Sequence, residues 1–230
     1  MKRTSKTGGF TLIELLTVIA IIGVLAAFTL AVVGGIKQRQ YISNVRAEME
    51  QLESAMERYK AAYGFYPPDS SKVVQNVPIN QLYFELLGTT NIGTPASPIY
   101  QSLDDPTIQL PQSAVNNIFG MSGIMNCSKP GSGEDTPKAQ NFLPNLRPNQ
   151  ICPAFTNSTD IHSFKMLITS VGGPDITYQP LGVGIIGVNP WRYNSSNPTN
   201  NPGGYDLWIQ LSIKGKTNLI CNWNKQVQIQ

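Results

Sequence analysis

The chain has 230 residues, of which 41% are hydrophobic, enough for one domain with its own core and an additional segment. Its formal net charge of +3 comes from Lys2, Arg3 and Lys6, because the rest of the chain has 14 basic and 14 acidic residues. Nucleic-acid-binding proteins normally carry a basic surplus, since phosphate contacts supply much of their affinity. The composition therefore argues against a nucleic-acid partner.

The first 66 residues contain no proline, whereas all 17 prolines fall between Pro67 and Pro202. Proline breaks helix interiors because it lacks an N–H donor and clashes with the preceding turn. Its absence predicts one helix from about Phe10 to Tyr63. Two helices hinged at Gly34 and Gly35 are the alternative.

This predicted helix has two halves of different character. Leu15–Ile36 is a run of 22 residues without charge, about 33 Å long at 1.5 Å per residue, which matches the hydrocarbon thickness of a bilayer. We therefore predict that residues 10–36 cross the membrane. Residues 37–63 instead carry apolar side chains every three or four positions, which indicates an amphipathic helix with one buried stripe: Ile42, Val45, Met49, Leu52, Met56, Tyr59 and Tyr63.

A carboxylate, Glu14, stands at the start of the apolar run, where a charge is costly and indicates a function. The sequence around it, Gly8-Gly9-Phe10-Thr11-Leu12-Ile13-Glu14, follows a short basic leader and continues through the apolar residues up to Ala27. This constellation resembles the signature of the type IV pilin-like family, which includes type IV pilins and the pseudopilins of type II secretion systems. It covers roughly residues 1–66. Many family members have a proline near the position of Ala31, which this chain lacks.

The resemblance implies how the N-terminus is processed and used. Residues 1–9 would be a leader peptide that a prepilin peptidase removes by cutting between Gly9 and Phe10. The same enzyme would methylate the new amine of Phe10. The carboxylate of Glu14 would then pair with the Phe10 amine, its own or a neighbour's, inside a filament. Opposite charges attract strongly in such an apolar setting, and an unpaired one is costly.

The remaining residues, 64–230, are predicted to form a periplasmic globular domain with long loops. A short amphipathic helix is expected at Asn80–Leu87, and most of residues 67–160 are expected to be irregular, with Ser128–Gln140 a loop. Strands are predicted near the C-terminus, where a hairpin turn at residues 214–216 joins two of them: Ser163–Ser170, Gly182–Val188, Tyr205–Ile213 and Asn218–Trp223. Within Tyr205–Ile213 apolar and polar residues alternate, which predicts an apolar face from Leu207 to Ile213 and a polar face that includes Asp206. The predicted fold class is α+β and pilin-like, with the long N-terminal helix packed on a C-terminal antiparallel sheet.

Two short segments, Tyr63–Pro67 and Tyr205–Trp208, resemble the major pseudopilin of type II secretion. In that group a calcium ion is bound by a loop near the second segment. Calcium prefers six to eight oxygen ligands, and this chain has no Asp or Glu after Asp206. We therefore predict no cofactor from the residues themselves. Calcium remains the alternative that the resemblance implies, with no ligands assigned.

The three cysteines, Cys127, Cys152 and Cys221, lack the short spacing of zinc or thioredoxin-type motifs. Outside the cytoplasm a disulfide between Cys127 and Cys152 is one expectation, and three buried thiols are the other. No convincing catalytic constellation surrounds the single histidine, His162, so we predict that the protein is not an enzyme.

Together these observations predict a structural subunit of a type II secretion pseudopilus that assists protein export across the outer membrane. It would sit in the bacterial inner membrane with one span and a periplasmic domain. Its partners would be the prepilin peptidase, copies of itself, minor pseudopilins and the inner-membrane assembly platform. The alternatives are a surface type IV pilin for adhesion or motility, and a pilin-anchored module that binds DNA or glycan.

Overall fold

The computed structural model describes residues 11–70, 73–74, 77–78, 80–129, 138–154, 164–173 and 188–229. The chain divides into two compact units, Met1–Ile42 and Ser43–Gln230. The elements follow one another in this order: α1 (Leu12–Tyr63), β1 (Val73–Val74), β2 (Val77–Pro78), α2 (Leu82–Leu87), β3 (Thr89–Asn91), β4 (Ile99–Ser102), β5 (Gln109–Pro111), α3 (Gln112–Phe119), β6 (Cys127–Ser128), the 3-10 helix η1 (Pro148–Gln150), β7 (Ile151–Ala154), β8 (Phe164–Leu167), β9 (Arg192–Asn194), β10 (Asp206–Ile213), β11 (Lys216–Cys221) and β12 (Asn224–Ile229).

Helix α1 contributes to both units. It has 52 residues and its helical backbone continues through Gly34 and Gly35, so the alternative of two hinged helices is wrong. It ends as predicted, because Gly64 adopts a left-handed φ of 85° and its N–H closes the last turn on the Lys60 carbonyl at 2.7 Å. The predicted start, Phe10, lies outside the described residues.

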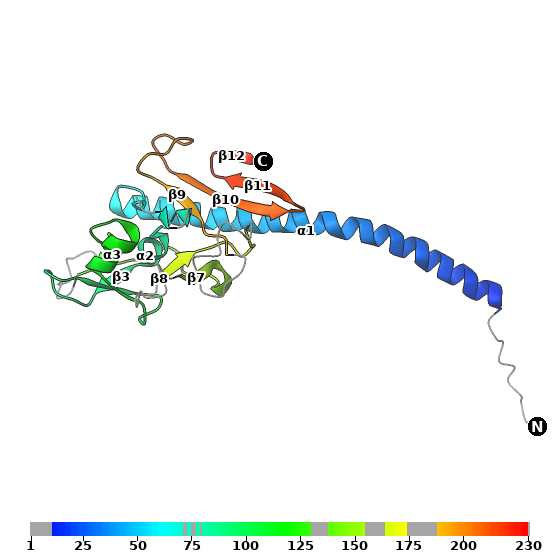
Figure 1. The fold of residues 1–230 in the computed structure, drawn as a ribbon, viewed down its shortest axis with the longest axis horizontal. Helices are drawn as coiled ribbons and strands as arrows, with labels where there is room; N and C mark the ends of the chain where they lie inside the picture. Colours follow the sequence, from blue (N-terminus) through cyan, green and yellow to red (C-terminus); the bar gives the residue numbers. More distant parts are fainter. Residues whose placement is uncertain are drawn as a thin grey trace, which may run out of the picture. The chain divides into compact units, whose positions relative to one another are not determined.

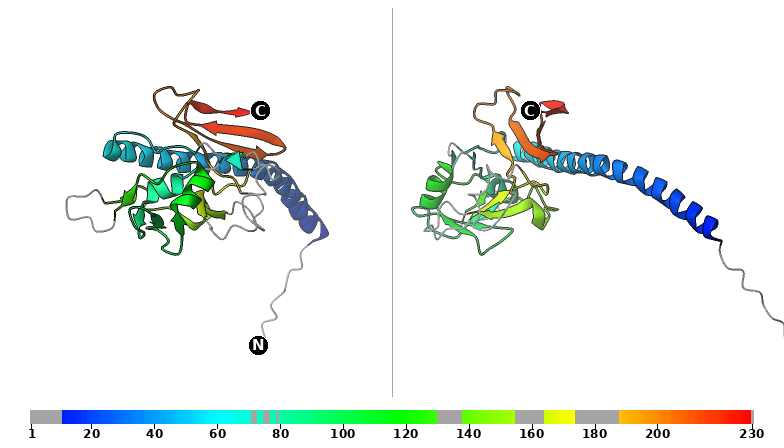
Figure 2. Two further views of the ribbon diagram at one scale, coloured as in Figure 1. Left: turned by 60° about the vertical axis from the view of Figure 1, so that its left-hand side comes forward. Right: turned by 45° about the vertical axis from the view of Figure 1, so that its right-hand side comes forward.

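The C-terminal strands form an antiparallel sheet in the order β12-β11-β10-β9, which lies along the second half of α1 (Figures 1 and 2). Strand β10 alternates as predicted, with its apolar residues buried at the odd positions from Leu207 to Ile213. The predicted hairpin turn is present, since Ile213 pairs with Lys216 across the two residues Lys214 and Gly215. Strand β12 was not predicted from the sequence.

The described part of residues 67–160 contains more regular elements than the few that the sequence predicts, although these elements are short. This region contains α2, α3 and a four-stranded sheet in the order β5-β4-β3-β6, in which only the β3–β6 pair is parallel. Strand β7 pairs with β8, the strand predicted within Ser163–Ser170. Residues 130–137 of the predicted loop and residues 182–187 of a predicted strand lie outside the described residues.

The core of the second unit joins α1 to these elements. Five of the seven residues of the predicted stripe on α1 are at most 4% exposed: Val45, Met49, Leu52, Met56 and Tyr59. Ile42 and Tyr63, at the two ends of the stripe, are half-buried. Helix α2 is buried on every side, Glu85 included, so the amphipathic character expected for it is wrong. A long N-terminal helix with a C-terminal antiparallel sheet confirms the predicted α+β class.

Candidate functional site

Three reciprocal hydrogen bonds between Thr11 and Glu14 cap the start of α1. The Thr11 backbone N–H and hydroxyl both donate to Oε2 of Glu14, at 2.8 and 2.7 Å. In return the Glu14 N–H donates to the Thr11 hydroxyl at 3.4 Å. This is a capping box, in which the fourth residue of a Thr-x-x-Glu sequence satisfies the open end of its own helix. The negative charge also lies where the helix dipole favours it.

Ten large apolar side chains between Leu12 and Leu25 of α1 are exposed to solvent in the described chain. Their exposed fractions run from 46% at Val18 to 80% at Leu12: Leu12, Ile13, Leu15, Leu16, Val18, Ile19, Ile21, Ile22, Val24 and Leu25. A continuous apolar surface of this kind on a protein marks a surface that contacts other molecules.

Within the part of the chain that the structure describes, no helix has the length and apolarity that a membrane crossing needs.

A buried polar network connects α1 to α2 and to the segment before β6. The Tyr59 hydroxyl donates to Oε2 of Glu85 at 2.8 Å, and the N–H groups of Met125 and Asn126 donate to the same carboxylate at 2.9 and 3.0 Å. The Tyr63 hydroxyl donates to Oδ1 of Asn126 at 2.8 Å. Burial raises the pKa of Glu85 above its ordinary value of 4.5, and these hydrogen bonds only partly offset that effect. No sequence motif indicated this network.

A second carboxylate, Asp206 at the start of β10, is held by the loop before it. It accepts hydrogen bonds from the backbone N–H groups of Thr199, Asn200 and Asn201 at 2.9, 3.0 and 2.9 Å. Burial acts to raise the pKa of Asp206, but the donors from Asn200, Thr199 and Asn201 outweigh it and the pKa lies below the ordinary 3.8. Alternation along the strand predicted that Asp206 lies on its polar face, yet the residue is 2% exposed.

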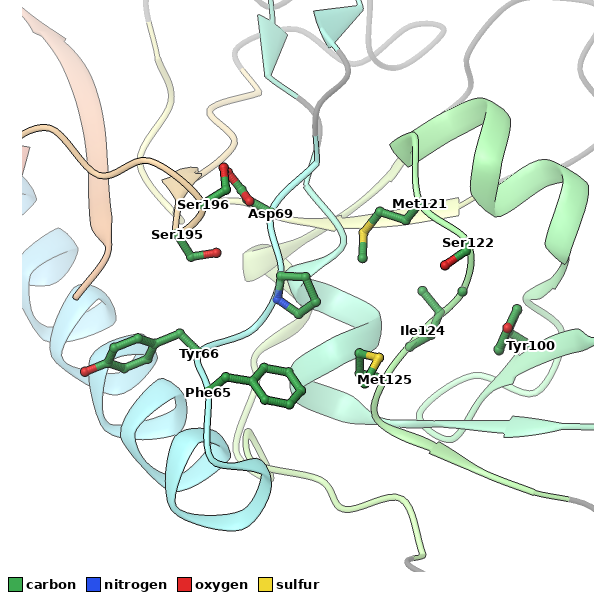
Figure 3. A pocket seen from close by; sticks show the side chains of 12 residues that line it. Phe65, Tyr66, Asp69, Tyr100, Met121, Ser122, Ile124, Met125, Ser195 and Ser196 are labelled. Atoms are coloured by element: carbon green, nitrogen blue, oxygen red, sulfur yellow. The ribbon is translucent and has the colours of Figure 1, made fainter. Parts of the chain in front are cut away.

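A cavity of about 570 Å³ opens beside the chain segment that follows α1. Figure 3 shows the ring of Phe65 lying opposite Met125, with Met121 close by, and these side chains form its apolar part. Its polar part holds Asp69, whose Oδ2 accepts a hydrogen bond from the Ser196 hydroxyl at 2.9 Å. No sequence pattern indicated this cavity, because its walls come from four segments that are far apart along the chain.

Comparison with known proteins decides the nature of the N-terminal segment. Residues 4–30 match the family model of the prokaryotic N-terminal methylation motif. The chain begins with a prepilin-type methylation motif. The resemblance predicted from Gly8 to Ala27 is thereby confirmed.

Two curated relatives extend this result beyond the motif. The chain is 37% identical over 67 residues to the type II secretion system core protein G of Escherichia coli K12. It is 34% identical over 67 residues to the protein of the same name from Vibrio cholerae. Each match covers 29% of this chain and 46% of the relative, so the chain spans less than half the length of the curated relatives it matches. No solved structure matches the chain.

The methylation motif contains the three residues to which the sequence assigned processing and assembly. Gly9 and Phe10 lie outside the described residues, so the cut between them, the methylation of Phe10 and its pairing with Glu14 stay predictions. Glu14 is described, and it bonds to Thr11 in the capping box. Oxygen Oε2 accepts both of those bonds, and among the described residues Oε1 accepts none.

The disulfide expected between Cys127 and Cys152 is absent from this structure, in which Cys127, Cys152 and Cys221 are free thiols. Cys127 lies on β6 and Cys152 on β7, strands of two different sheets. Burial raises the pKa of Cys152 to about 11, which keeps this thiol protonated and unreactive at neutral pH. Among the described residues no three His, Cys, Asp or Glu side chains cluster as metal ligands. The calcium site stays a prediction without assigned ligands.

Proposed function

We propose that this chain is a structural subunit of a type II secretion pseudopilus. In this role it polymerises through the first half of α1 and assists the export of proteins across the outer membrane. The single observation that carries the proposal is the overlap of the methylation motif, residues 4–30, with the first part of α1, whose large apolar side chains are exposed from Leu12 to Leu25. Such a surface has to be covered by lipid or by other copies of the same helix.

The geometry at Glu14 supports a role in assembly. Thr11 holds the carboxylate at the first turn of α1. Thr11 directly follows Phe10, and cleavage before Phe10 would turn the backbone nitrogen of Phe10 into a free amine. Because Oε1 accepts no hydrogen bond among the described residues, it is available to an amine while Oε2 keeps the capping box intact. A buried ion pair of this kind favours one register of neighbouring helices, since an unpaired charge in an apolar filament core is costly.

The match to core protein G supports the assignment to type II secretion in particular. By this proposal the chain is anchored in the inner membrane by residues 10–36 and exposes its second unit to the periplasm. The prepilin peptidase, minor pseudopilins and the assembly platform are the partners that the role requires. The role is structural, and the export energy comes from another component.

The first test is the mass of the mature N-terminus from cells with and without a prepilin peptidase. We expect the mature chain to begin at Phe10 with a methylated amine, and the precursor to keep residues 1–9 when the peptidase is absent. A native chain that still begins at Met1 in cells with the peptidase would contradict the proposal.

The second test is Glu14→Ala in the full chain, with Glu50→Ala as the matched control. Glu50 is an exposed carboxylate on the same helix, outside the apolar segment. We expect Glu14→Ala to be cleaved normally but to give far fewer chemically crosslinked multimers, while Glu50→Ala assembles like the wild type. Normal assembly of Glu14→Ala would remove the role assigned to this carboxylate. Filaments extending from intact wild-type cells at native expression would instead indicate a surface pilin.

A further inference from the structure

The β10–β11 hairpin presents two lysines at its tip. Lys214 and Gly215 form its two-residue turn with left-handed φ values of 52° and 73°, and Lys216 begins β11 directly after them. All three residues are exposed. Among the described residues, neither lysine takes part in an ion pair. The hairpin tip is therefore an exposed, positively charged turn.

The cavity beside the end of α1 has the complementary chemistry. Its apolar part includes Phe65 and Met125, which are 41% and 51% exposed, unusually high for side chains of this size and type. Its polar part offers the carboxylate of Asp69, of which Oδ2 is held by Ser196 and Oδ1 accepts no hydrogen bond among the described residues. Figure 3 shows Asp69 and Ser196 on one side of the hollow and Phe65 with Met125 on another.

A lysine side chain suits such a cavity better than a purely apolar group. Its four-carbon stem packs on apolar surface while the ammonium group remains with a polar partner at the rim. Methionine adapts its shape to an incoming side chain, which is why it recurs at binding surfaces.

Three charged groups of α1 also lie near this wall. Lys60 is 4.2 Å from the Tyr66 ring, and Glu57 accepts a hydrogen bond from the Tyr66 hydroxyl at 2.9 Å. Burial raises the pKa of Tyr205, which packs on Tyr66, and the charges of Glu53 and Glu57 raise it further. Asp69 adds its charge to those of the two α1 carboxylates, so the acidic groups here outnumber the single lysine.

The hairpin tip and the cavity lie at the two ends of the same strand. Tyr205, directly before β10, packs on Tyr66 of the cavity wall with ring centroids 4.7 Å apart. Strand β10 then runs eight residues to the hairpin, which at about 3.3 Å per residue places the tip roughly 26 Å from the cavity. The tip of one molecule therefore cannot reach its own cavity. Figure 1 shows β10 running along α1 from the end of that helix back toward its middle.

We propose that the Lys214–Lys216 hairpin tip of one copy inserts into the Asp69 cavity of the next copy along the filament. This inference rests on the proposed function, because it requires that the chain polymerises. A contact between two different surfaces of identical copies is heterologous, and it generates an open filament when the operation relating the copies does not close. The proposed contact adds ion pairs between the second units of neighbouring copies to the apolar contact between their helices.

The test is a charge exchange in the full chain, read as crosslinked multimers in the producing cells. Asp69→Lys and the double variant Lys214→Glu/Lys216→Glu should each lower the multimer yield roughly tenfold, since like charges then face each other. Combining the three substitutions should restore most of the yield. Lys225→Glu is the matched control for one lysine reversal, because it replaces an exposed lysine by glutamate on strand β12 of the same sheet and should leave the yield unchanged.

A site-specific crosslink gives an independent readout. Ser122→Cys in the cavity wall combined with Lys214→Cys at the tip should yield covalent dimers and higher multimers with a short thiol crosslinker. Ser122→Cys combined with Lys225→Cys, and each single variant beside the three native thiols, should not. A thermal unfolding curve of each variant shows whether the second unit remains folded.

The outcomes separate the two proposals. If Glu14→Ala lowers assembly while the charge-exchange variants assemble normally, the hairpin contact is wrong and the pseudopilus function stands. If both charge reversals lower assembly but their combination gives no recovery, the two sites do not meet and the contact is likewise wrong. If the wild-type chain forms no multimers with the complete secretion apparatus present, the proposed function itself fails.

Discussion

The hydroxyl of Tyr59 on α1 donates a hydrogen bond of 2.8 Å to the buried carboxylate of Glu85 on α2. The two residues are 26 positions apart, and the bond ties the second half of the long helix to the interior of the globular unit. Glu85 in turn accepts the N–H groups of Met125 and Asn126, which fix the segment that lines the cavity. One carboxylate thus positions both the helix and the cavity wall.

Tyr59→Phe tests the weight of this bond. The substitution keeps the ring, which packs 4.6 Å from the Tyr63 ring, and removes only the hydroxyl. We expect a loss of about 1–2 kcal/mol in the free energy of unfolding, because Oε2 of the buried carboxylate loses a donor. Denaturant unfolding of the full chain in detergent, followed by tryptophan fluorescence, measures it. Tyr41→Phe is the control, since Tyr41 is 44% exposed and the change should stay within about 0.5 kcal/mol.

Glu85 also predicts a pH dependence. Because the folded pKa of Glu85 is raised above 4.5, the folded chain binds more protons than the unfolded chain between 4.5 and the folded pKa. The contribution of Glu85 to stability is thus fully present below pH 4.5 and is lost as the pH rises through the folded pKa. Glu85→Gln, which cannot titrate, should remove this decline. Unfolding curves at several pH values compare the two chains, and parallel curves would contradict the assignment.

The sequence predicted the elements whose signals are local. The buried stripe on α1 follows from its three-and-four spacing, and the α1 stop follows from Gly64 and the prolines after it. The β10–β11 hairpin follows from alternation and a lysine–glycine turn. By contrast, the sheet β5-β4-β3-β6 is built from strands of two to four residues, too short for an alternating pattern to be recognised.

The candidate sites divide in the same way. The methylation motif is a contiguous signature, so the segment that contains Gly9, Phe10 and Glu14 can be recognised from the sequence alone, while the roles of these three residues stay predictions. The cavity and the Glu85 network depend on residues brought together from different segments, and no spacing rule reports such contacts. Asp206 was assigned to a polar strand face because alternation carries no information about a preceding loop that donates three N–H groups.

Asp206→Asn is expected to destabilise the second unit by about 2 kcal/mol at neutral pH, since hydrogen bonds to a charged acceptor are stronger than those to an amide. The pKa of Asp206 is below 3.8 in the folded chain, so its contribution is present above pH 3.8 and is lost as the pH falls through the folded pKa. The deficit of the Asn variant should therefore shrink in acid. Unfolding midpoints between neutral pH and pH 2 measure this, with Glu50→Gln on the exposed face of α1 as the control.

Substitutions in the β10–β11 turn can distinguish an effect on the stability of the fold from an effect on the proposed contact between copies. Gly215 has a φ of 73°, and no heavy atom lies within 4 Å of the position that a Cβ would take there. Gly215→Ala should therefore cost about 1 kcal/mol through backbone strain alone, which thermal unfolding of the full chain measures.

Lys214 has a φ of 52°, a conformation that asparagine adopts more readily, and Asn-Gly is the preferred sequence for such a turn. Lys214→Asn should therefore stabilise the second unit by about 0.5 kcal/mol. The same variant should reduce filament crosslinking, because it removes a cation from the docking tip. Thermal unfolding and multimer yield, measured on one preparation, should move in opposite directions. If both rise together, Lys214 serves the turn and contributes nothing to the contact between copies.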